Sequence, residues 1–160
     1  MDARRHAYFL CVAEALAQCQ LLELQLKFHI SSAFELRAKK PYAPVPFKMT
    51  PAMAKKAKKE HAKAPLGSLI KYFERLSDSP ALVASLKKFT KKRNRLAHAL
   101  LAAALDYEGE LDYGKADSLT GEVEMTKETA LRLNDEVHAA SLPWIVHLYL
   151  DVIEDDKPAN

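Results

Sequence analysis

The sequence predicts an all-α protein, a bundle of four or five helices. Apolar residues recur every three or four positions over long stretches, which is the period of helices buried on one side. No series of segments alternates apolar and polar residues as half-buried strands do. Of the 160 residues, 4 are glycine and 49% are hydrophobic. This composition disfavours glycine-rich phosphate loops and predicts that residues 1–160 form a single domain with a core.

The first predicted helix spans residues 3–37. Its two cysteines, Cys11 and Cys19, are too few for a disulfide framework, and we interpret them as core residues of a reduced protein. One apolar face follows steps of three and four residues, and we expect it to be buried: Tyr8, Val12, Ala15, Cys19, Leu22, Leu26, Ile30 and Ala33.

The beginning of this helix also resembles a signal peptide, because two arginines precede an apolar stretch. Glu14 interrupts that stretch, and the helical period continues through Leu26, so we interpret the segment as part of the mature helix. No uninterrupted apolar run approaches the roughly 18–20 residues that span a bilayer. We therefore expect a cytoplasmic protein without a membrane partner.

The next two predicted helices are short. Three prolines between Lys39 and Phe47 predict a loop, and Thr50 followed by proline is typical of a helix start. We expect a helix over 51–63, rich in alanine and lysine, which either buries little or forms a mobile basic arm. A further helix is expected over 66–77.

Ser79 followed by proline predicts the start of a long helix over 80–105. The acidic segment that follows contains several turn residues, and we leave open whether 107–125 forms a small hairpin or an irregular loop. We expect Thr126 to cap a last helix over 127–154. Pro143 lies inside that helix, so a kink or break is expected near residues 139–143.

Charge is distributed unevenly along the chain. Residues 37–95 contain 17 Lys and Arg against three acidic residues, a net charge of +14, whereas residues 106–156 have a net charge of −11. One interpretation is that the basic half binds an anionic partner, above all nucleic acid. The other is that the two halves partly neutralise each other in the fold or across a dimer.

The residues best suited to catalysis or ligand binding lie in the helix over 80–105. Continuing the apolar step of that helix places Arg93 in the line of core positions, where burial of a guanidinium is costly unless an anion meets it. Asn94 and His98 are one turn apart and share a face. In a regular α-helix Arg93 and His98 lie about 140° apart, so both can flank one groove without touching.

An arginine and a histidine beside one groove suit the cleavage of RNA. Arginine binds the phosphate and stabilises its developing charge. Histidine can take a proton from a ribose 2′-hydroxyl or give one to the leaving oxygen. Because RNA supplies its own nucleophile, we expect no metal and no other cofactor. We expect Asn94 to orient the two side chains and a basic flank to hold the RNA: Lys88, Lys91, Lys92 and Arg95.

The segment Arg93–His98, Arg-Asn-Arg-Leu-Ala-His, resembles the Arg-polar-x3-His motif of HEPN domains. A leucine-glycine segment at Leu66–Lys71 is similar to one that precedes the motif helix in many HEPN proteins. The resemblance implies a dimeric α-bundle with two Arg/His pairs facing one cleft. It also implies a metal-independent endoribonuclease that leaves 2′,3′-cyclic phosphate ends, often a toxin or phage-defence component with an antitoxin or regulatory partner.

Two observations bear on this resemblance. A looser form of the motif recurs at Arg132–His138, in acidic surroundings and with leucine after the arginine, and we interpret that copy as coincidental. HEPN toxins that a nucleotidyltransferase modifies have a tyrosine two residues after the histidine, where this chain has Leu100. The alternative hypothesis is a non-catalytic dimeric module that binds RNA, a nucleotide or a partner protein.

Overall fold

The all-α prediction is confirmed by the computed structural model, which describes residues 3–41, 43 and 46–155. Beyond one isolated bridge between Leu105 and Leu111, the described residues contain no β-structure. The elements are α1 (Ala3–Lys39), α2 (Pro51–Glu60), the 3₁₀ turn η1 (His61–Lys63), α3 (Leu66–Glu74), α4 (Pro80–Arg95), the π-helical turn η2 (Leu96–Leu100), α5 (Leu101–Ala103) and α6 (Tyr113–Asp155).

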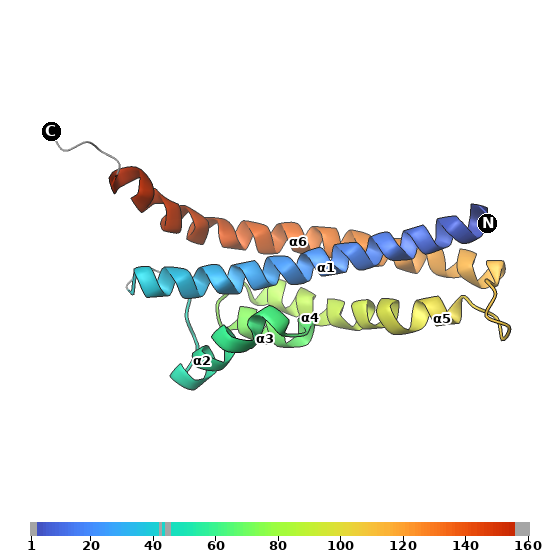
Figure 1. Ribbon diagram of the computed structural model, residues 1–160, viewed down its shortest axis with the longest axis horizontal. Coiled ribbons are helices and arrows are strands. Elements are labelled where there is room, and N and C mark those ends of the chain that lie inside the picture. Colours follow the sequence, from blue (N-terminus) through green and yellow to red (C-terminus); the bar gives the residue numbers. More distant parts are fainter. Residues whose placement is uncertain (1–2, 42, 44–45, 156–160) are drawn as a thin grey trace.

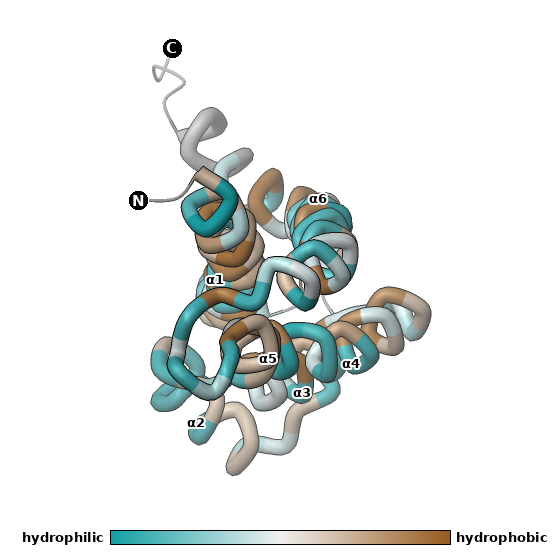
Figure 2. Tube along the Cα trace, turned by 90° about the vertical axis from the view of Figure 1, so that its right-hand side faces the viewer, coloured by the Kyte–Doolittle hydropathy of each residue, from teal (hydrophilic) through white to brown (hydrophobic). Residues whose placement is uncertain are grey.

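Two long helices, α1 and α6, lie side by side and form one layer (Figures 1 and 2). They run in parallel, because partners along α1 meet partners in the same order along α6: Glu14 with Lys127, Gln25 with His138, and His29 with Ser141. The second layer contains α2, α3, α4 and α5 (Figure 2). The run from α4 through η2 to α5 lies along the long helices, whereas α2 and α3 cover one end (Figure 1).

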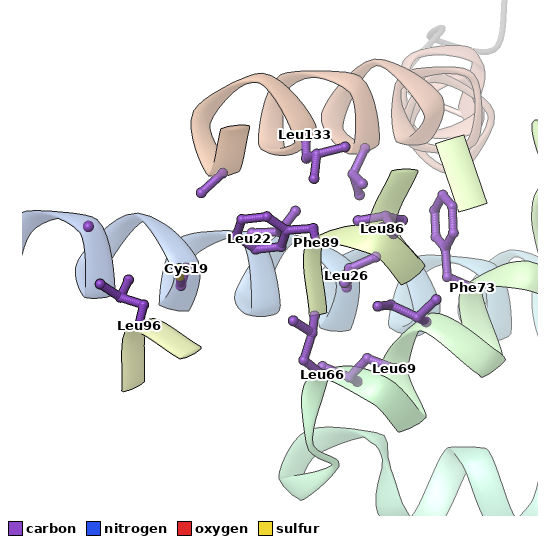
Figure 3. Close-up of a cluster of buried hydrophobic side chains, with 14 of the residues drawn as sticks. Cys19, Leu22, Leu26, Leu66, Leu69, Phe73, Leu86, Phe89, Leu96 and Leu133 are labelled. Atoms are coloured by element: carbon purple, nitrogen blue, oxygen red, sulfur yellow. The ribbon is translucent and has the colours of Figure 1, made fainter. Parts of the chain in front are cut away.

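The core lies between the two layers. Every position that the apolar period of α1 predicts as buried is at most 4% exposed: Tyr8, Val12, Ala15, Cys19, Leu22, Leu26, Ile30 and Ala33. Figure 3 shows Cys19, Leu22 and Leu26 of this line among side chains of other helices, including Phe73 of α3, Phe89 of α4 and Leu133 of α6. Burial of large side chains from four helices supplies most of the driving force for the layered arrangement.

The start of the last helix was predicted wrongly. Helix α6 begins at Tyr113 rather than near 127, and Thr126 is buried inside it, where its hydroxyl donates to the Glu122 carbonyl at 2.8 Å. The helix start is set instead by Asp112, whose carboxylate accepts the Lys115 amide at 3.1 Å. Asp112 is a good N-cap residue, so a signal for this start was present in the sequence.

The turn before α6 is compact. The side chain of Asp106 accepts the backbone amides of Glu108 and Glu110, both at 2.9 Å. Gly109 adopts φ of +81°, a conformation that favours glycine. The undecided stretch 107–125 is therefore a tight turn followed by helix, with the bridge between Leu105 and Leu111 as its one hairpin-like feature among the described residues.

Pro143 does not end α6, which continues to Asp155. The red C-terminal part of the helix turns away from the direction of the rest (Figure 1). A proline inside a helix removes one backbone hydrogen bond and crowds the preceding turn, which accounts for a bend without a break.

The alanine- and lysine-rich segment forms a helix with little to bury. In α2 the hydroxyl of Thr50 accepts the Met53 amide at 3.3 Å, as expected of an N-cap, and Ala57 is the buried residue. At its end, His61 Nε2 lies 2.8 Å from Ser31 Oγ of α1, while His61 Nδ1 donates to the Ala57 carbonyl at 2.9 Å. These contacts join the basic helix to the long helix.

Helix α1 also contains an 18-residue window that is long and apolar enough to cross a membrane by length and composition. The same helix supplies the buried line that packs against α3, α4 and α6. The buried line of α1 therefore belongs to the core of the helical bundle, whereas other apolar side chains of the same helix are exposed.

Candidate functional site

The candidate site lies where α4 passes into η2. The hydroxyl of Ser79 accepts the Leu82 amide at 3.3 Å and caps α4, as the sequence predicts. Leu86, Phe89 and Leu96 then hold the helix against the core, each no more than 1% exposed. This packing fixes the orientation of the segment that carries Arg93, Asn94 and His98.

Arg93 is met by an anion from within the same chain. Its Nε and Nη2 atoms both donate to Oε1 of Glu23 on α1, at 3.2 and 2.9 Å. The two side chains are 28% and 16% exposed, so the pair is largely shielded from solvent. The carboxylate of Glu23 offsets the desolvation of the guanidinium at this core position. It also neutralises part of the charge that an external phosphate would meet.

Sequence reasoning missed Glu23. In α1 it lies one position beyond Leu22 at the edge of the buried face. A carboxylate in that place is a candidate partner for a buried cation. The period of apolar residues does not show which other helix places a cation beside it.

The π-helical turn carries His98. Both Leu96 and Leu100 remain buried at its ends, whereas Asn94 and His98 are exposed. The hydroxyl of Tyr8 donates to the Leu100 carbonyl at 3.2 Å, which ties the turn to α1. A π-helix rotates less per residue than an α-helix, so the angle of 140° between Arg93 and His98 in a regular helix does not hold.

Among the described residues, no hydrogen bond or ion pair joins Arg93, Asn94 and His98 to one another. The arginine faces Glu23, while the asparagine and the histidine face solvent. The predicted orienting contact through the Asn94 amide is therefore not formed in this state of the chain.

The basic flank divides into paired and unpaired residues. Arg95 Nε lies 2.6 Å from Oε1 of Glu122 on α6, an ion pair that joins the basic and acidic parts of the chain. Lys88, Lys91 and Lys92 are exposed and have no ion-pair partner within the part of the chain that the structure describes. Three of the four predicted RNA-binding residues thus present free ammonium groups.

A second basic feature lies between α2 and α3. A cleft of about 490 Å³ is lined by Lys56, Lys59 and Lys63, one carboxylate, Glu60, and the ring of Tyr72. The tyrosine side chain is 8% exposed at this cleft, whereas the neighbouring Phe73 is fully buried in the core. The lysine cations suit the backbone of a nucleic-acid strand, whereas the buried ring offers little surface for base stacking. The sequence indicated the lysine run, but the cleft requires the packing of α2 on α3.

Three of the other histidines, His29, His61 and His138, have side-chain contacts within the chain. His29 is 1% exposed and its Nδ1 lies 2.7 Å from Ser141 Oγ. Its ring lies between those of Phe73 and Trp144, tilted against both, with ring centroids 4.6 and 4.0 Å away. Burial lowers the pKa of His29 to about 3, against a smaller opposing effect of the Leu76 carbonyl. His29 is therefore a neutral core residue at physiological pH.

The second copy of the motif lies on the surface of α6, where both of its residues have partners. Arg132 pairs with Glu136 four residues later, and His138 Nδ1 lies 3.4 Å from the side-chain nitrogen Nε2 of Gln25. Both residues lie on α6, whose flanks are acidic. Arg132 and His138 provide a matched control for Arg93 and His98.

The cysteines and acidic groups give little further chemistry. Cys19 is buried and Cys11 half-buried, and burial raises the pKa of the Cys19 thiol to about 11, so that thiol is protonated and unreactive at neutral pH. Within the described ranges, His, Cys, Asp and Glu form no group of three or more that could hold a metal ion.

No known protein-family model matches the sequence, and neither a curated protein nor a solved structure gives a significant match.

Proposed function

We propose that the chain is a HEPN-type endoribonuclease that cleaves RNA without a metal. The observation that carries this proposal is the exposed His98 on a π-helical turn, directly after the unpaired lysines of α4. π-Helical turns inside α-helices are frequent at functional sites. The resemblance of Arg93–His98 to the HEPN motif supports the same reaction.

In this reaction the ribose 2′-oxygen attacks the adjacent phosphorus and the bond to the 5′-oxygen breaks. His98 takes the proton of the 2′-hydroxyl or gives a proton to the departing 5′-oxygen. The products are a 2′,3′-cyclic phosphate and a 5′-hydroxyl. Lys91 and Lys92 hold the strand beside His98, and Lys88 extends the contact along α4.

Arg93 binds the scissile phosphate through the edge of its guanidinium that Glu23 leaves open. Glu23 takes the Nε–Nη2 edge, which leaves the N–H groups of Nη1 without a partner among the described residues. Glu23 is then a positioning residue that fixes the orientation of Arg93. Asn94 forms its orienting contacts only when RNA is bound.

The second candidate is a non-catalytic module that binds RNA on the same basic surface. The observation that favours it is the Arg93–Glu23 pair, because an internal carboxylate already meets the charge of the arginine. In this case the lysines of α4 and of the cleft between α2 and α3 track the RNA backbone, and Arg93 stabilises the fold.

The experiment that separates the two candidates is incubation of the purified protein with transfer RNA and a mixed RNA pool in EDTA. The variants are His98→Ala and the matched control His138→Ala. We expect cleavage with cyclic-phosphate ends, identified by mass spectrometry, from the wild type and from His138→Ala only. Cleavage that persists in His98→Ala overturns the assignment of the site.

Intact RNA in every lane, together with a gel shift, favours the binding module. That shift is tested with a triple variant, Lys88→Gln, Lys91→Gln and Lys92→Gln. If each lysine contacts one phosphate of a single strand, the slope of log affinity against log salt becomes less negative by about 2 in total. Absence of both cleavage and binding rejects an RNA function for this surface.

In the cell, the nuclease acts as a toxin or phage-defence component that an antitoxin or regulatory protein holds inactive. Expression of the wild type then arrests growth, while His98→Ala does not. Growth arrest by both proteins in equal measure excludes RNA cleavage at His98 as its cause.

A further inference from the structure

A serine and a histidine from different helices meet near the C-terminal end of α1. Ser31 Oγ of α1 lies 2.8 Å from Nε2 of His61, the first residue of η1. The other ring nitrogen, His61 Nδ1, lies 2.9 Å from the carbonyl oxygen of Ala57. Because a carbonyl oxygen only accepts hydrogen bonds, Nδ1 carries a proton. In the neutral imidazole Nε2 is then the acceptor, and the Ser31 hydroxyl donates to it.

This direction of the Ser31 hydroxyl is unlike that of other hydroxyl groups on the helices. Serine and threonine inside a helix commonly return the hydroxyl proton to a backbone carbonyl one turn earlier. In this chain five of them do so: Thr90, Thr120, Thr126, Thr129 and Ser141. Ser31 instead directs its proton to a base supplied by another element.

The second contact between a serine and a histidine shows what the first one adds. Ser141 Oγ lies 2.7 Å from His29 Nδ1, but its hydroxyl donates to the Val137 carbonyl at 2.8 Å. Ser141 and His29 are 0% and 1% exposed, so a substrate from solvent does not reach them. Ser31, in contrast, is exposed and His61 is half-buried. The Ser31–His61 pair therefore combines a hydroxyl directed at a base with access from solvent.

The imidazole of His61 is held in one orientation. The Ala57 carbonyl accepts both the backbone amide and Nδ1 of His61, and Ala57 is fully buried. The ring of Phe34 flanks the imidazole with centroids 6.4 Å apart, and Phe34 is itself packed edge-on against Phe47 at 5.7 Å. A nucleophile, a base and a third group that orients the base are the elements of an activated serine. Here the orienting group is a backbone carbonyl.

A cavity of about 410 Å³ lies beside the Ser31–His61 pair. It is lined by Ser31, Phe34, Glu35, Ala38, Lys58 and His61. Phe34 and Ala38 supply an apolar wall that suits a short hydrocarbon chain. The carboxylate of Glu35 is engaged by Lys39 at 2.7 Å, whereas Lys58 has no ion pair within the part of the chain that the structure describes. The cavity thus offers an apolar surface and one ammonium group next to the serine.

We propose that Ser31 and His61 are the nucleophile and the general base of a second active site, which hydrolyses short-chain carboxylic esters. The apolar wall at Phe34 and Ala38 binds the acyl chain. The ammonium group of Lys58 stabilises the negative charge that develops on the carbonyl oxygen of the ester. Lys58 and His61 are three residues apart, a spacing that places both on one side of the helix.

The reaction proceeds through an acyl-serine. Ser31 Oγ bonds to the carbonyl carbon while its proton passes to His61 Nε2, and the negative oxygen lies beside Lys58. The bond from the carbonyl carbon to the alcohol oxygen then breaks, and His61 gives its proton to the departing alcohol. Water next adds to the acyl-serine and gives a proton to His61. The acid leaves as Ser31 recovers its proton, so that one ester and one water become one acid and one alcohol.

This site is separate from the candidate RNA site. His98 lies on the turn that Tyr8 ties to α1, near the opposite end of that helix from Ser31. At a rise of about 1.5 Å per residue, Tyr8 and Ser31 are about 35 Å apart along α1. Figure 1 shows the same separation, with α2 at one end of the molecule and α5 toward the other. The ester hydrolysis therefore does not depend on the proposed cleavage of RNA.

Labelling with a fluorophosphonate probe tests the nucleophile. Ser31 Oγ bonds to phosphorus, fluoride leaves and His61 takes the hydroxyl proton, so we expect a single adduct that mass spectrometry maps to Ser31. Ser31→Ala is expected to give no adduct. The matched control is Ser118→Ala, because Ser118 is an exposed helical serine that returns its hydroxyl to the Lys115 carbonyl at 2.7 Å. That variant should react as the wild type does.

The base is tested with His61→Gln. Glutamine keeps a side chain that can hydrogen-bond to Ser31, but it does not take up a proton at neutral pH. We expect labelling at least about 100-fold slower than in the wild type, with an unchanged urea-unfolding midpoint. A wild type that acquires no adduct on Ser31, or a His61→Gln variant labelled at the wild-type rate, overturns the proposal.

Turnover is measured with 4-nitrophenyl butyrate. We expect hydrolysis above the buffer rate from the wild type, none from Ser31→Ala, and a rate at least tenfold lower for Lys58→Gln. Lys55→Gln, at an exposed position of the same helix, is the matched control and should keep the wild-type rate. Hydrolysis that persists in Ser31→Ala overturns the proposal, and equal rates for the two lysine variants overturn the role of Lys58. Cleavage of RNA by Ser31→Ala, assayed in parallel, keeps the two activities distinguishable.

Discussion

The two layers of this protein present opposite kinds of outer surface. The α1–α6 layer is apolar and nearly uncharged on its outside along α1, while the layer of α2, α3 and α4 exposes lysines without partners in the described chain. Both layers contribute their inner faces to one core. A net charge of +3 therefore conceals an uneven surface, which is apolar along the outside of α1 and cationic over α2 and α4.

The comparison also extends to stability. Helices α1 and α6 bury long lines of side chains, whereas α2 buries only Ala57. Packing of apolar surface contributes most of the stability of a small domain. The long layer should therefore determine global unfolding, and the basic helix α2 should contribute little to it.

The largest effect is expected from a core substitution in the α1–α6 layer. Leu26→Ala removes a fully buried side chain of α1 and should lower the free energy of unfolding by about 2–5 kcal/mol. Met53→Ala, at a half-buried position of α2, should cost less than about 1 kcal/mol. Urea unfolding followed by circular dichroism measures both values. Equal losses would contradict the division of stability between the layers.

An intermediate effect concerns pH. The pKa of His29 is about 3 in the folded chain against an ordinary 6.5, so below pH 6.5 the unfolded chain binds the proton that the folded chain refuses. Stability is unaffected above that pH and falls as the pH is lowered from 6.5 toward 3. Between pH 7 and pH 5 the loss should reach about 2 kcal/mol.

The variant His29→Phe isolates this contribution. Phenylalanine keeps the ring contacts with Phe73 and Trp144, and Ser141 retains its hydrogen bond to the Val137 carbonyl. Urea unfolding at pH 7 and pH 5 should show a smaller pH dependence for the variant than for the wild type. An identical pH dependence in the two proteins would contradict the prediction that His29 is protonated over this range in the unfolded chain but not in the folded chain.

The smallest effect concerns the coupling energies of two ion pairs, one between the layers and one within the basic layer. The Arg93–Glu23 pair crosses from α4 to α1 and is mostly shielded, whereas the Lys87–Glu74 pair lies within the basic layer, with side chains 52% and 43% exposed. Double-mutant cycles with glutamine should give a coupling energy of about 1 kcal/mol for the first pair and below about 0.5 kcal/mol for the second. Comparable couplings would remove the distinction.

Several features of the fold and the candidate site followed from the sequence. The apolar period of α1 predicted its buried face, and Thr50 and Ser79 predicted the starts of α2 and α4, because caps and amphipathic periods are local properties. The interpretation of Thr126 as a cap failed because the tight turn at Asp106–Glu110 and the cap Asp112 begin α6 earlier. A threonine inside a helix can return its hydroxyl to a carbonyl, and sequence alone does not separate that role from capping.

Local sequence pattern was enough to predict the all-α class, the core line of α1 and the position of Arg93 among apolar residues. These depend on intervals of three and four residues within one helix. The tertiary structure alone decided that Glu23 meets Arg93, that His98 lies on a π-helical turn, and that Leu21, Leu24 and Phe28 of α1 stay exposed. Those outcomes require the relative rotation and register of helices far apart in the chain, which many side chains fix together when the core packs.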